Sequence, residues 1–239
     1  MFIISPLSRC ASPSKRDIFL DHITKIASVT NDNEPNCHAY AWFKSAEDND
    51  SVPHHWLRGF EVYNDVEANT ITHRASAEYK AFRVAVGEDK LLEQPSDLRF
   101  WRPINIGFLT RNQSMKFMDN STTGGHYVVV DELMSEVGKL ELIMEHLRGM
   151  ALEAEKLEQI LSFWVLRRDD EKDPAFLVFS CYLDKEAWVT FNGQTEVDEA
   201  WRAAHESSKE QRRTTWIESG LGFLGREELH ANVHKPMKR

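Results

Sequence analysis

The chain has 239 residues, of which 41% are hydrophobic and 28% are charged, and its formal net charge at pH 7 is −9. This composition is typical of a globular protein with enough apolar material for a core, in one large domain or two of ordinary size. The acidic balance argues against nucleic acid as a partner, because phosphate binding needs clustered Lys and Arg. No stretch approaches the roughly 20 apolar residues of a membrane span, so we expect no membrane association.

The cysteines and the N-terminus bear on the cellular compartment. Cys10, Cys37 and Cys181 are odd in number and lack the spacing of a metal site. They fit free thiols in a reducing compartment better than a disulfide framework. The apolar residues 2–7 are too few for the core of a signal peptide, so we expect a cytoplasmic protein.

The first half of the chain shows the pattern of a strand, a helix, two strands, a helix and a strand. A capping box at residues 14–17 opens the first helix, which ends before Pro35 because proline cannot continue a helix. The second helix is expected from Asp65 onward. The pattern predicts strands at residues 2–8, 37–44, 55–63 and 98–109.

The same order returns after residues 113–125, a polar stretch whose Ser, Thr and Gly residues favour a linker. Here we predict strands at residues 126–133, 157–167, 174–182 and 221–229, and helices at residues 138–155 and over most of residues 184–219. The predicted organisation is an N-terminal repeat (1–112), a linker (113–125), a C-terminal repeat (126–230) and a tail (231–239).

The two halves also align directly, without gaps, at a constant offset of 119 residues. Residues 60–68 correspond to residues 179–187, and residues 81–83 correspond to residues 200–202 at the same offset. The alignment indicates two copies of one module of about 110 residues, the length of a small domain.

The copies differ at two polar positions. Ser180 replaces Glu61, and Asn192 replaces His73. Neither Ser nor Asn serves as a general base near neutral pH, so only the first copy keeps a candidate acid/base pair. The second copy is then either a drifted half kept for its sheet or a wall for a cavity in the first.

A β-α-β-β-α-β unit covers one face of its sheet with helices and leaves the other face bare. Because a bare apolar face of that size must be buried, two units in one chain can bury their faces against each other. The predicted fold class is α+β, with two ferredoxin-like repeats packed sheet to sheet as an intramolecular dimeric α/β barrel.

Part of the first half resembles a known family. Residues 61–63, Ala68, His73 and residues 76–82 are similar to the second half of antibiotic biosynthesis monooxygenase (ABM) domains, and residues 34–40 resemble the family's turn into its second strand. On this resemblance, residues 1–110 form one such domain and residues 126–230 a more diverged copy. Tandem versions of this kind resemble fungal secondary-metabolism proteins.

The resemblance implies dimeric α/β barrels whose oxygenases oxidise phenolic or anthrone-like substrates without metal, flavin or haem. We therefore expect a cofactor-independent monooxygenase that acts on an aromatic polyketide-like intermediate of secondary metabolism and consumes O₂. His73 would be the general base, since an imidazole beside a carboxylate is active near neutral pH, and Glu61 would orient it. The alternative is that both groups only close the top of the barrel by hydrogen bonding.

Aromatic side chains are the candidates for substrate binding. Tyr40 and Trp42 alternate on one predicted strand and share a face with His38, while Trp56 and Tyr63 belong to the next strand. A planar substrate is held by such walls, although core packing explains any single tryptophan equally well. His54 and His55 are adjacent and point to opposite faces of a strand, so no metal site is predicted.

Other functions remain open at this stage. The same acid/base pair can drive a non-oxidative cyclisation, dehydration, decarboxylation or isomerisation, and the fold also suits a ligand-binding barrel without chemistry. Pairing of sheet edges between barrels would give a homodimer of pseudo-dimers.

Overall fold

The computed structural model describes residues 1–98, 100–111, 115–117, 125–168 and 174–226. The predicted tail, residues 231–239, lies outside the described residues, as does most of the predicted linker. Among the described residues, no helix has the length and hydrophobicity that crossing a bilayer requires.

The first repeat contains two long helices and the strands of one antiparallel sheet. Helix α1 begins one residue after Ser12, whose side chain accepts a hydrogen bond from the backbone N–H of Lys15 at 3.2 Å. The strand predicted over residues 2–8 forms as two shorter strands. The elements are β1 (Phe2–Ile4), β2 (Leu7–Ser8), α1 (Pro13–Asn33), β3 (Cys37–Ser45), β4 (Leu57–Tyr63), the π-helix η1 (Ala68–Thr72), the 3₁₀ helix η2 (His73–Ala75), α2 (Ala77–Glu88) and β5 (Phe100–Phe108). The two-residue strand β6 (Met115–Lys116) lies in the predicted linker and pairs with β10 (Ser208–Leu224).

The second repeat follows the same order with regular helices throughout. Its elements are β7 (Tyr127–Ser135), α3 (Leu140–Glu155), β8 (Ile160–Arg168), β9 (Ala175–Tyr182), α4 (Lys185–Asn192), α5 (Thr195–Glu206) and β10 (Ser208–Leu224).

The helix predicted over most of residues 184–219 is wrong beyond Glu206, where the 17-residue strand β10 takes its place. The first part of β10 pairs with β7 and the last part with β3. Arg212 and Arg213 bind Glu132 and Asp131 across the β7 pairing. Residues 209–213 favour a helix by propensity, but the pairing with β7 and these ion pairs outweigh that weak preference.

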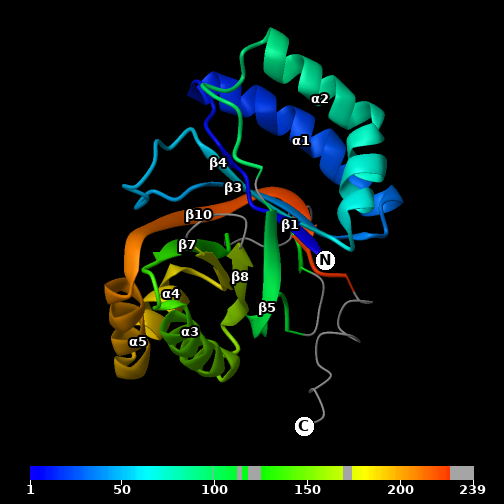
Figure 1. The fold of residues 1–239 in the computed structure, drawn as a ribbon. Coiled ribbons are helices and arrows are strands. Elements are labelled where there is room, and N and C mark those ends of the chain that lie inside the picture. Colours follow the sequence, from blue (N-terminus) through cyan, green and yellow to red (C-terminus); the bar gives the residue numbers. More distant parts are fainter. Residues whose placement is uncertain (99, 112–114, 118–124, 169–173, 227–239) are drawn as a thin grey trace.

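The strands close into one barrel. Each repeat contributes a four-stranded antiparallel sheet, in the orders β5-β1-β4-β3 and β10-β7-β9-β8. The sheets join at both edges, because β5 pairs with β8 and β10 pairs with β3. Figure 1 shows α1 and α2 on one side of the barrel and α3, α4 and α5 on the other. The predicted intramolecular dimeric α/β barrel is confirmed.

Three apolar layers follow from this arrangement. The barrel interior contains Phe60 and Phe179, which correspond at the offset of 119 and stack with their ring centroids 3.9 Å apart. A second layer lies between the first sheet and α1 and α2, and a third lies between the second sheet and α3 to α5. Since alternate residues of a strand face opposite sides, β4 directs Phe60 and Val62 inward and Glu61 and Tyr63 toward the helices.

The two seams between the sheets use the same backbone device. Gly107 of β5 and Gly222 of β10 have positive φ angles of 80° and 95°, each at an irregularity in its strand pairing. A Cβ atom would lie 1.8 Å from the Phe163 carbonyl oxygen at the first position and 1.8 Å from the Tyr40 carbonyl oxygen at the second. Only glycine fits there, so each last strand bends onto the sheet of the other repeat.

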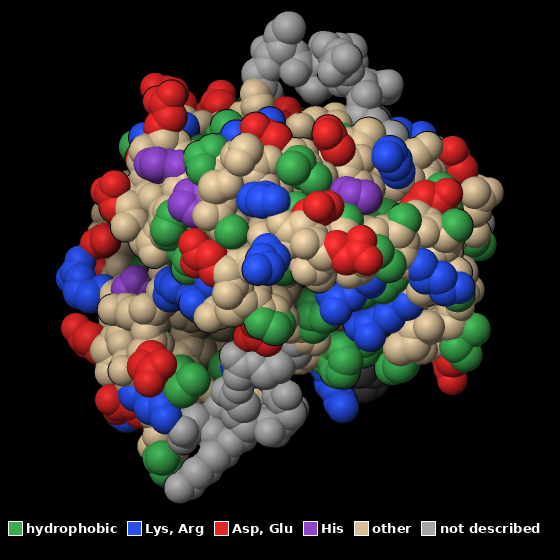
Figure 2. All heavy atoms as spheres, turned by 90° about the horizontal axis from the view of Figure 1, so that it is seen from above, with side chains coloured by type: hydrophobic (Ala, Val, Ile, Leu, Met, Phe, Trp, Pro, Cys, Tyr) green, Lys and Arg blue, Asp and Glu red, His purple; other side chains and the backbone are tan. Residues whose placement is uncertain are grey.

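The outer surface over the helices of the first repeat is highly charged. Figure 2 looks onto the molecule from this side, and acidic and basic side chains are interspersed over it.

Candidate active site

A cavity of about 120 Å³ lies between the sheet of the first repeat and helices α1 and α2. Its walls are largely apolar and include the aromatic side chains of Phe19, Tyr40, Trp42, Tyr79 and Phe82. Its polar lining consists of Glu61, Asn69, Arg74 and Arg83, besides two serines. The described residues contain no ion pair or hydrogen bond to the side chain of Arg74 or Arg83. An apolar hollow with a few convergent polar groups is the usual form of a small-molecule site.

Glu61 is the carboxylate of this cavity. It is 7% exposed, and it accepts a hydrogen bond from the Tyr63 hydroxyl at 2.8 Å. Burial raises the pKa of Glu61 above its ordinary value of 4.5, while the nearby His73 and the Tyr63 hydroxyl act in the opposite direction. A buried carboxyl with a raised pKa holds a proton more readily than an exposed one, as a general base requires.

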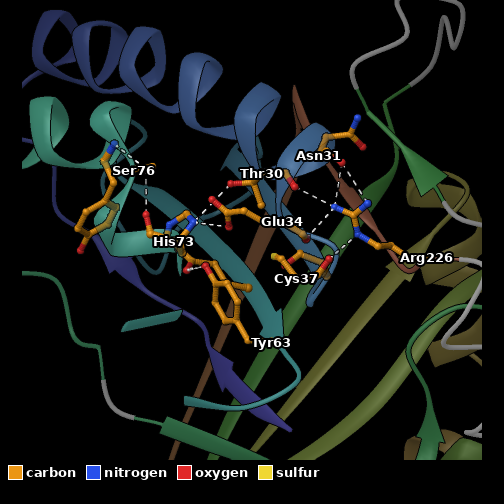
Figure 3. Close-up of polar contacts among 11 residues, drawn as sticks. Thr30, Asn31, Glu34, Cys37, Tyr63, His73, Ser76 and Arg226 are labelled. Carbon is orange, nitrogen blue, oxygen red and sulfur yellow. Dashed lines mark hydrogen bonds and ion pairs between the residues drawn. The ribbon is translucent and has the colours of Figure 1, made fainter. Parts of the chain in front are cut away.

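His73 lies deeper, behind the cavity wall. Its Nδ1 atom is 3.0 Å from Oε2 of Glu34 and 3.4 Å from Oγ1 of Thr30 (Figure 3). The rings of Tyr40, Tyr63 and Tyr79 surround the imidazole at centroid distances of 5.2, 5.5 and 5.2 Å. The carboxylate that orients His73 is therefore Glu34, and Glu61 lies between His73 and the cavity.

The backbone before His73 has an unusual geometry. Asp65 caps it by accepting a hydrogen bond from the N–H of Ala68 at 2.8 Å, and the chain then runs through the π-helix η1 into η2. Ser76 caps the following helix α2 by accepting a hydrogen bond from the Tyr79 N–H at 3.2 Å. Single π-helical turns are rare and occur often at functional sites. This turn places Asn69 on the cavity wall and His73 behind it.

Two buried polar atoms on the cavity wall have no partner among the described residues. They are Oδ1 of Asn69 and Nε1 of Trp42, from side chains that are 1% and 4% exposed. Burial raises the pKa of the Tyr40 hydroxyl, and the nearby Trp42 indole lowers it by a smaller amount. The indole N–H of Trp42 and the Tyr40 hydroxyl nevertheless lack hydrogen-bond geometry. One acceptor and one donor are thus available to a ligand, and such groups require an explanation in a native fold.

Of the five residues expected to bind substrate, Tyr40 and Trp42 line the cavity. His38 instead has its Nε2 atom 2.8 Å from Oδ1 of Asn64, where the β3 register shifts. Trp56 packs against the barrel interior, and Tyr63 lies behind Glu61 as its hydrogen-bond donor.

The sequence interpretation missed Asn69 and Glu34. Asn69 carries no signal apart from its nearness to His73, because a π-helix has no simple sequence pattern. Glu34 was interpreted only as the end of the first helix and the start of the turn into the second strand. Its position directly before Pro35 offered no sign that its side chain would reach residue 73.

Larger hollows of about 290 and 220 Å³ lie at one end of the barrel. Glu132 lines both hollows and binds Arg58 at 2.9 Å and Arg212 at 2.7 Å. Burial acts to raise the pKa of Glu132, but these two arginines hold it below the ordinary value. This cluster joins the two repeats. We assign the candidate site to the smaller cavity, which combines the buried carboxylate of Glu61 with aromatic side chains.

A family match covers the part of the chain that contains this cavity. Residues 7–85 match the model of the family described as antibiotic biosynthesis monooxygenase. The predicted resemblance is confirmed: residues 7–85 of the first repeat match an ABM domain, and the closed barrel of the whole chain fits a tandem-repeat member of this family. This assignment supports a monooxygenase-like enzyme. No curated protein matches the chain by sequence.

Solved structures share the fold over nearly the whole chain. A monooxygenase candidate from Lactobacillus acidophilus is 12% identical with a TM-score of 0.69, covering 94% of this chain and 95% of its own. Another, from Fusobacterium nucleatum, is 11% identical with a TM-score of 0.72 and covers 94% of both chains. A protein described as anthrone oxidase-like is 12% identical with a TM-score of 0.62, covering 95% of this chain and 94% of its own. At these identities the likeness shows the fold alone.

Proposed function

We propose that the protein is a cofactor-independent monooxygenase that acts on a phenol or anthrone in the cavity of the first repeat. The observation that carries this proposal is Glu61, a buried carboxylate with a raised pKa on the wall of an aromatic cavity. The ABM match of residues 7–85 supports the reaction class. The fold shared with an anthrone oxidase-like protein is consistent with the substrate class.

In the proposed reaction Glu61 removes a proton from the CH₂ group of an anthrone or from a phenol. His73, held by Glu34, stabilises the charge on Glu61, and its distance from the cavity lining favours this role over direct contact with substrate. The substrate carbanion then reacts with O₂. The CH₂ group loses two hydrogens and gains one oxygen atom, while the other oxygen leaves as water, so the substrate supplies all the electrons.

The remaining polar groups fit substrate binding. Trp42 can donate and Asn69 can accept a hydrogen bond, as a hydroxylated aromatic ring requires. Arg74 and Arg83 supply positive charge next to an anionic intermediate. Since typical ligand sites exceed about 300 Å³, a substrate of three fused rings requires the side chains at the rim to move outward. Arg83 is exposed and free to do so.

Consumption of O₂ by the purified protein with 1,8-dihydroxyanthrone tests this proposal. Glu61→Gln preserves the shape of the side chain and removes the base, so kcat/KM should fall by about 100-fold or more. The matched control is Ser180→Ala at the equivalent position of the second repeat, which should keep full activity. Full activity of Glu61→Gln would contradict the role of Glu61, and a product of unchanged oxidation state would replace the oxygenase with an isomerase or cyclase using the same base.

A further inference from the structure

Each repeat ends with the same short sequence. Residues 107–111 read Gly-Phe-Leu-Thr-Arg, and residues 222–226 read Gly-Phe-Leu-Gly-Arg, at an offset of 115. The two glycines form the seams of the barrel, as described above. Each arginine therefore lies four residues after a seam glycine, at equivalent positions of the two repeats.

The arginines make equivalent hydrogen bonds. Arg226 donates from Nε to the carbonyl oxygen of Cys37 at 2.5 Å and from Nη2 to those of Asn31 and Glu34 at 3.1 and 3.3 Å (Figure 3). It also donates from Nη2 to the carbonyl oxygen of Thr30 at 2.9 Å.

Arg111 repeats this pattern in the second repeat. It donates from Nε to the carbonyl oxygen of Ile160 at 2.6 Å and from Nη2 to those of Ala154 and Leu157 at 2.6 and 2.5 Å. These three acceptors follow Cys37, Asn31 and Glu34 by a constant 123 residues. Each guanidinium also lies over the phenylalanine of its own motif, at 4.8 Å for Arg111 and 4.5 Å for Arg226.

Both arginines cap the end of a helix that belongs to the other repeat. Arg226 follows β10 and binds the end of α1, while Arg111 follows β5 and binds the end of α3. The last carbonyls of a helix lack partners within it and carry partial negative charge, so a guanidinium satisfies both needs. We call this pair of contacts the reciprocal clasp.

The two halves of the clasp differ in what they hold. Glu34 accepts from Arg226 through its backbone and reaches His73 through its carboxylate at 3.0 Å. Thr30 does the same, with its carbonyl on Arg226 and its hydroxyl near His73. At the position of Glu34 the second repeat has Leu157, which cannot make a polar contact of this kind.

We infer that Arg226 is a positioning residue for the candidate active site: the second repeat fixes the end of α1 and thereby holds Glu34 and Thr30 against His73. Without the clasp, the last turn of α1 frays and Glu34 loses its fixed position. Arg111 secures α3 in the same manner without touching a titratable pair. The effect on turnover rests on the proposed function, whereas the effect on the His73 ring does not.

The test compares Arg226→Gln with Arg111→Gln in the full chain labelled with ¹⁵N-histidine. The ¹⁵N signal of the His73 ring is identified by its loss in His73→Asn. In Arg226→Gln this signal should change and should match the His73 signal of Glu34→Gln, because both variants remove the fixed carboxylate from Nδ1 of His73. Arg111→Gln should lower the unfolding temperature by a similar amount and leave the signal unchanged. Arg226→Lys keeps the charge without the planar fork, so we expect a partial change.

The same variants are then assayed for O₂ consumption, where Arg226→Gln should lower kcat/KM about tenfold and Arg111→Gln should not. An unchanged His73 signal in folded Arg226→Gln, or an equal change in Arg111→Gln, would overturn the inference. A shifted signal in a protein whose wild type lacks oxygenase activity would preserve the positioning role and reject the proposed function instead.

Discussion

The two helix–sheet layers of the barrel have the same backbone arrangement, but different side chains occupy the space between helices and sheet. Asp65 and Asp184 cap equivalent turns, each accepting a backbone hydrogen bond at 2.8 Å. After this point the first layer continues through a π-helix, whereas the second continues through the regular helix α4. In the second layer Phe191 is fully buried and contacts the rings of Phe163 and Tyr182.

Polar groups show the same contrast. In the second layer the buried carboxylate of Asp131 binds Arg213 at 2.6 Å, and this arginine offsets only part of the rise in the Asp131 pKa that burial causes. Glu61 of the first layer has the Tyr63 hydroxyl and the imidazole of His73 nearby. One layer thus neutralises its carboxylate with a guanidinium, and the other leaves a carboxylate facing a cavity. The two repeats thus share a backbone frame and differ in the surroundings of their buried carboxylates.

The largest expected effect concerns the packing of apolar side chains between the second sheet and its helices. Phe191→Ala removes a fully buried ring and should lower the free energy of unfolding by about 3–5 kcal/mol, measured by urea denaturation. Phe82→Ala borders the existing cavity of the first layer and opens it to water, so its cost should be about 1–2 kcal/mol smaller. Equal losses in both variants would show that the two layers are packed alike.

A smaller effect tests the seams that both layers share. Gly107→Ala and Gly222→Ala each introduce a Cβ atom against a backbone carbonyl at a positive φ angle, which should cost about 2–3 kcal/mol. Of the two variants, only Gly222→Ala places its Cβ atom against the backbone of Tyr40, which lines the cavity. This variant alone should therefore also reduce turnover. Measuring stability and kcat/KM together separates the two outcomes, and an equal loss of activity in both variants would argue against a site confined to the first layer.

The smallest effect concerns pH. The pKa of Glu61 is raised in the folded protein. The carboxyl group therefore contributes stability that is fully present below pH 4.5 and is lost as the pH rises through the pKa of the folded state. The free energy of unfolding of wild type should therefore fall, relative to Glu61→Gln, over this window, by about 1.4 kcal/mol for each unit of displacement. Ser180→Ala should keep the wild-type slope. If Glu61→Gln also keeps that slope, the carboxyl of Glu61 titrates normally and its raised pKa is contradicted.

Much of the fold could be predicted from the sequence, because hydrophobic periodicity and the offset of 119 both reflect local constraints. Strands β3 and β4 and helix α3 have nearly the expected bounds. The strand over residues 208–219 could not be predicted locally, since its partners lie in β7 and in β3, whose paired residues are more than 170 positions away. The motif at residues 107–111 and 222–226 was present in the sequence, but its meaning depends on contacts between repeats.

The candidate site was predicted in part. The sequence indicated Glu61, Tyr40 and Trp42, which line the cavity, because alternation along a strand decides which side chains share a face. It assigned Glu61 as the partner of His73, and this pairing depends on side-chain geometry in three dimensions. Glu34 reaches His73 from the end of a different helix, across 39 residues of sequence. No period of 2 or 3.6 residues encodes such a contact.

The reciprocal clasp also sets an order of events in the cell. Since Arg226 ends β10 and fastens α1, the ribosome makes most of the candidate site within the first 100 residues but supplies its last fastening more than 120 residues later. A nascent first repeat therefore emerges with its acid/base groups present and the end of α1 untied. On the proposed function, we therefore expect the first repeat to reach full activity only after the second has been synthesised and has closed the barrel.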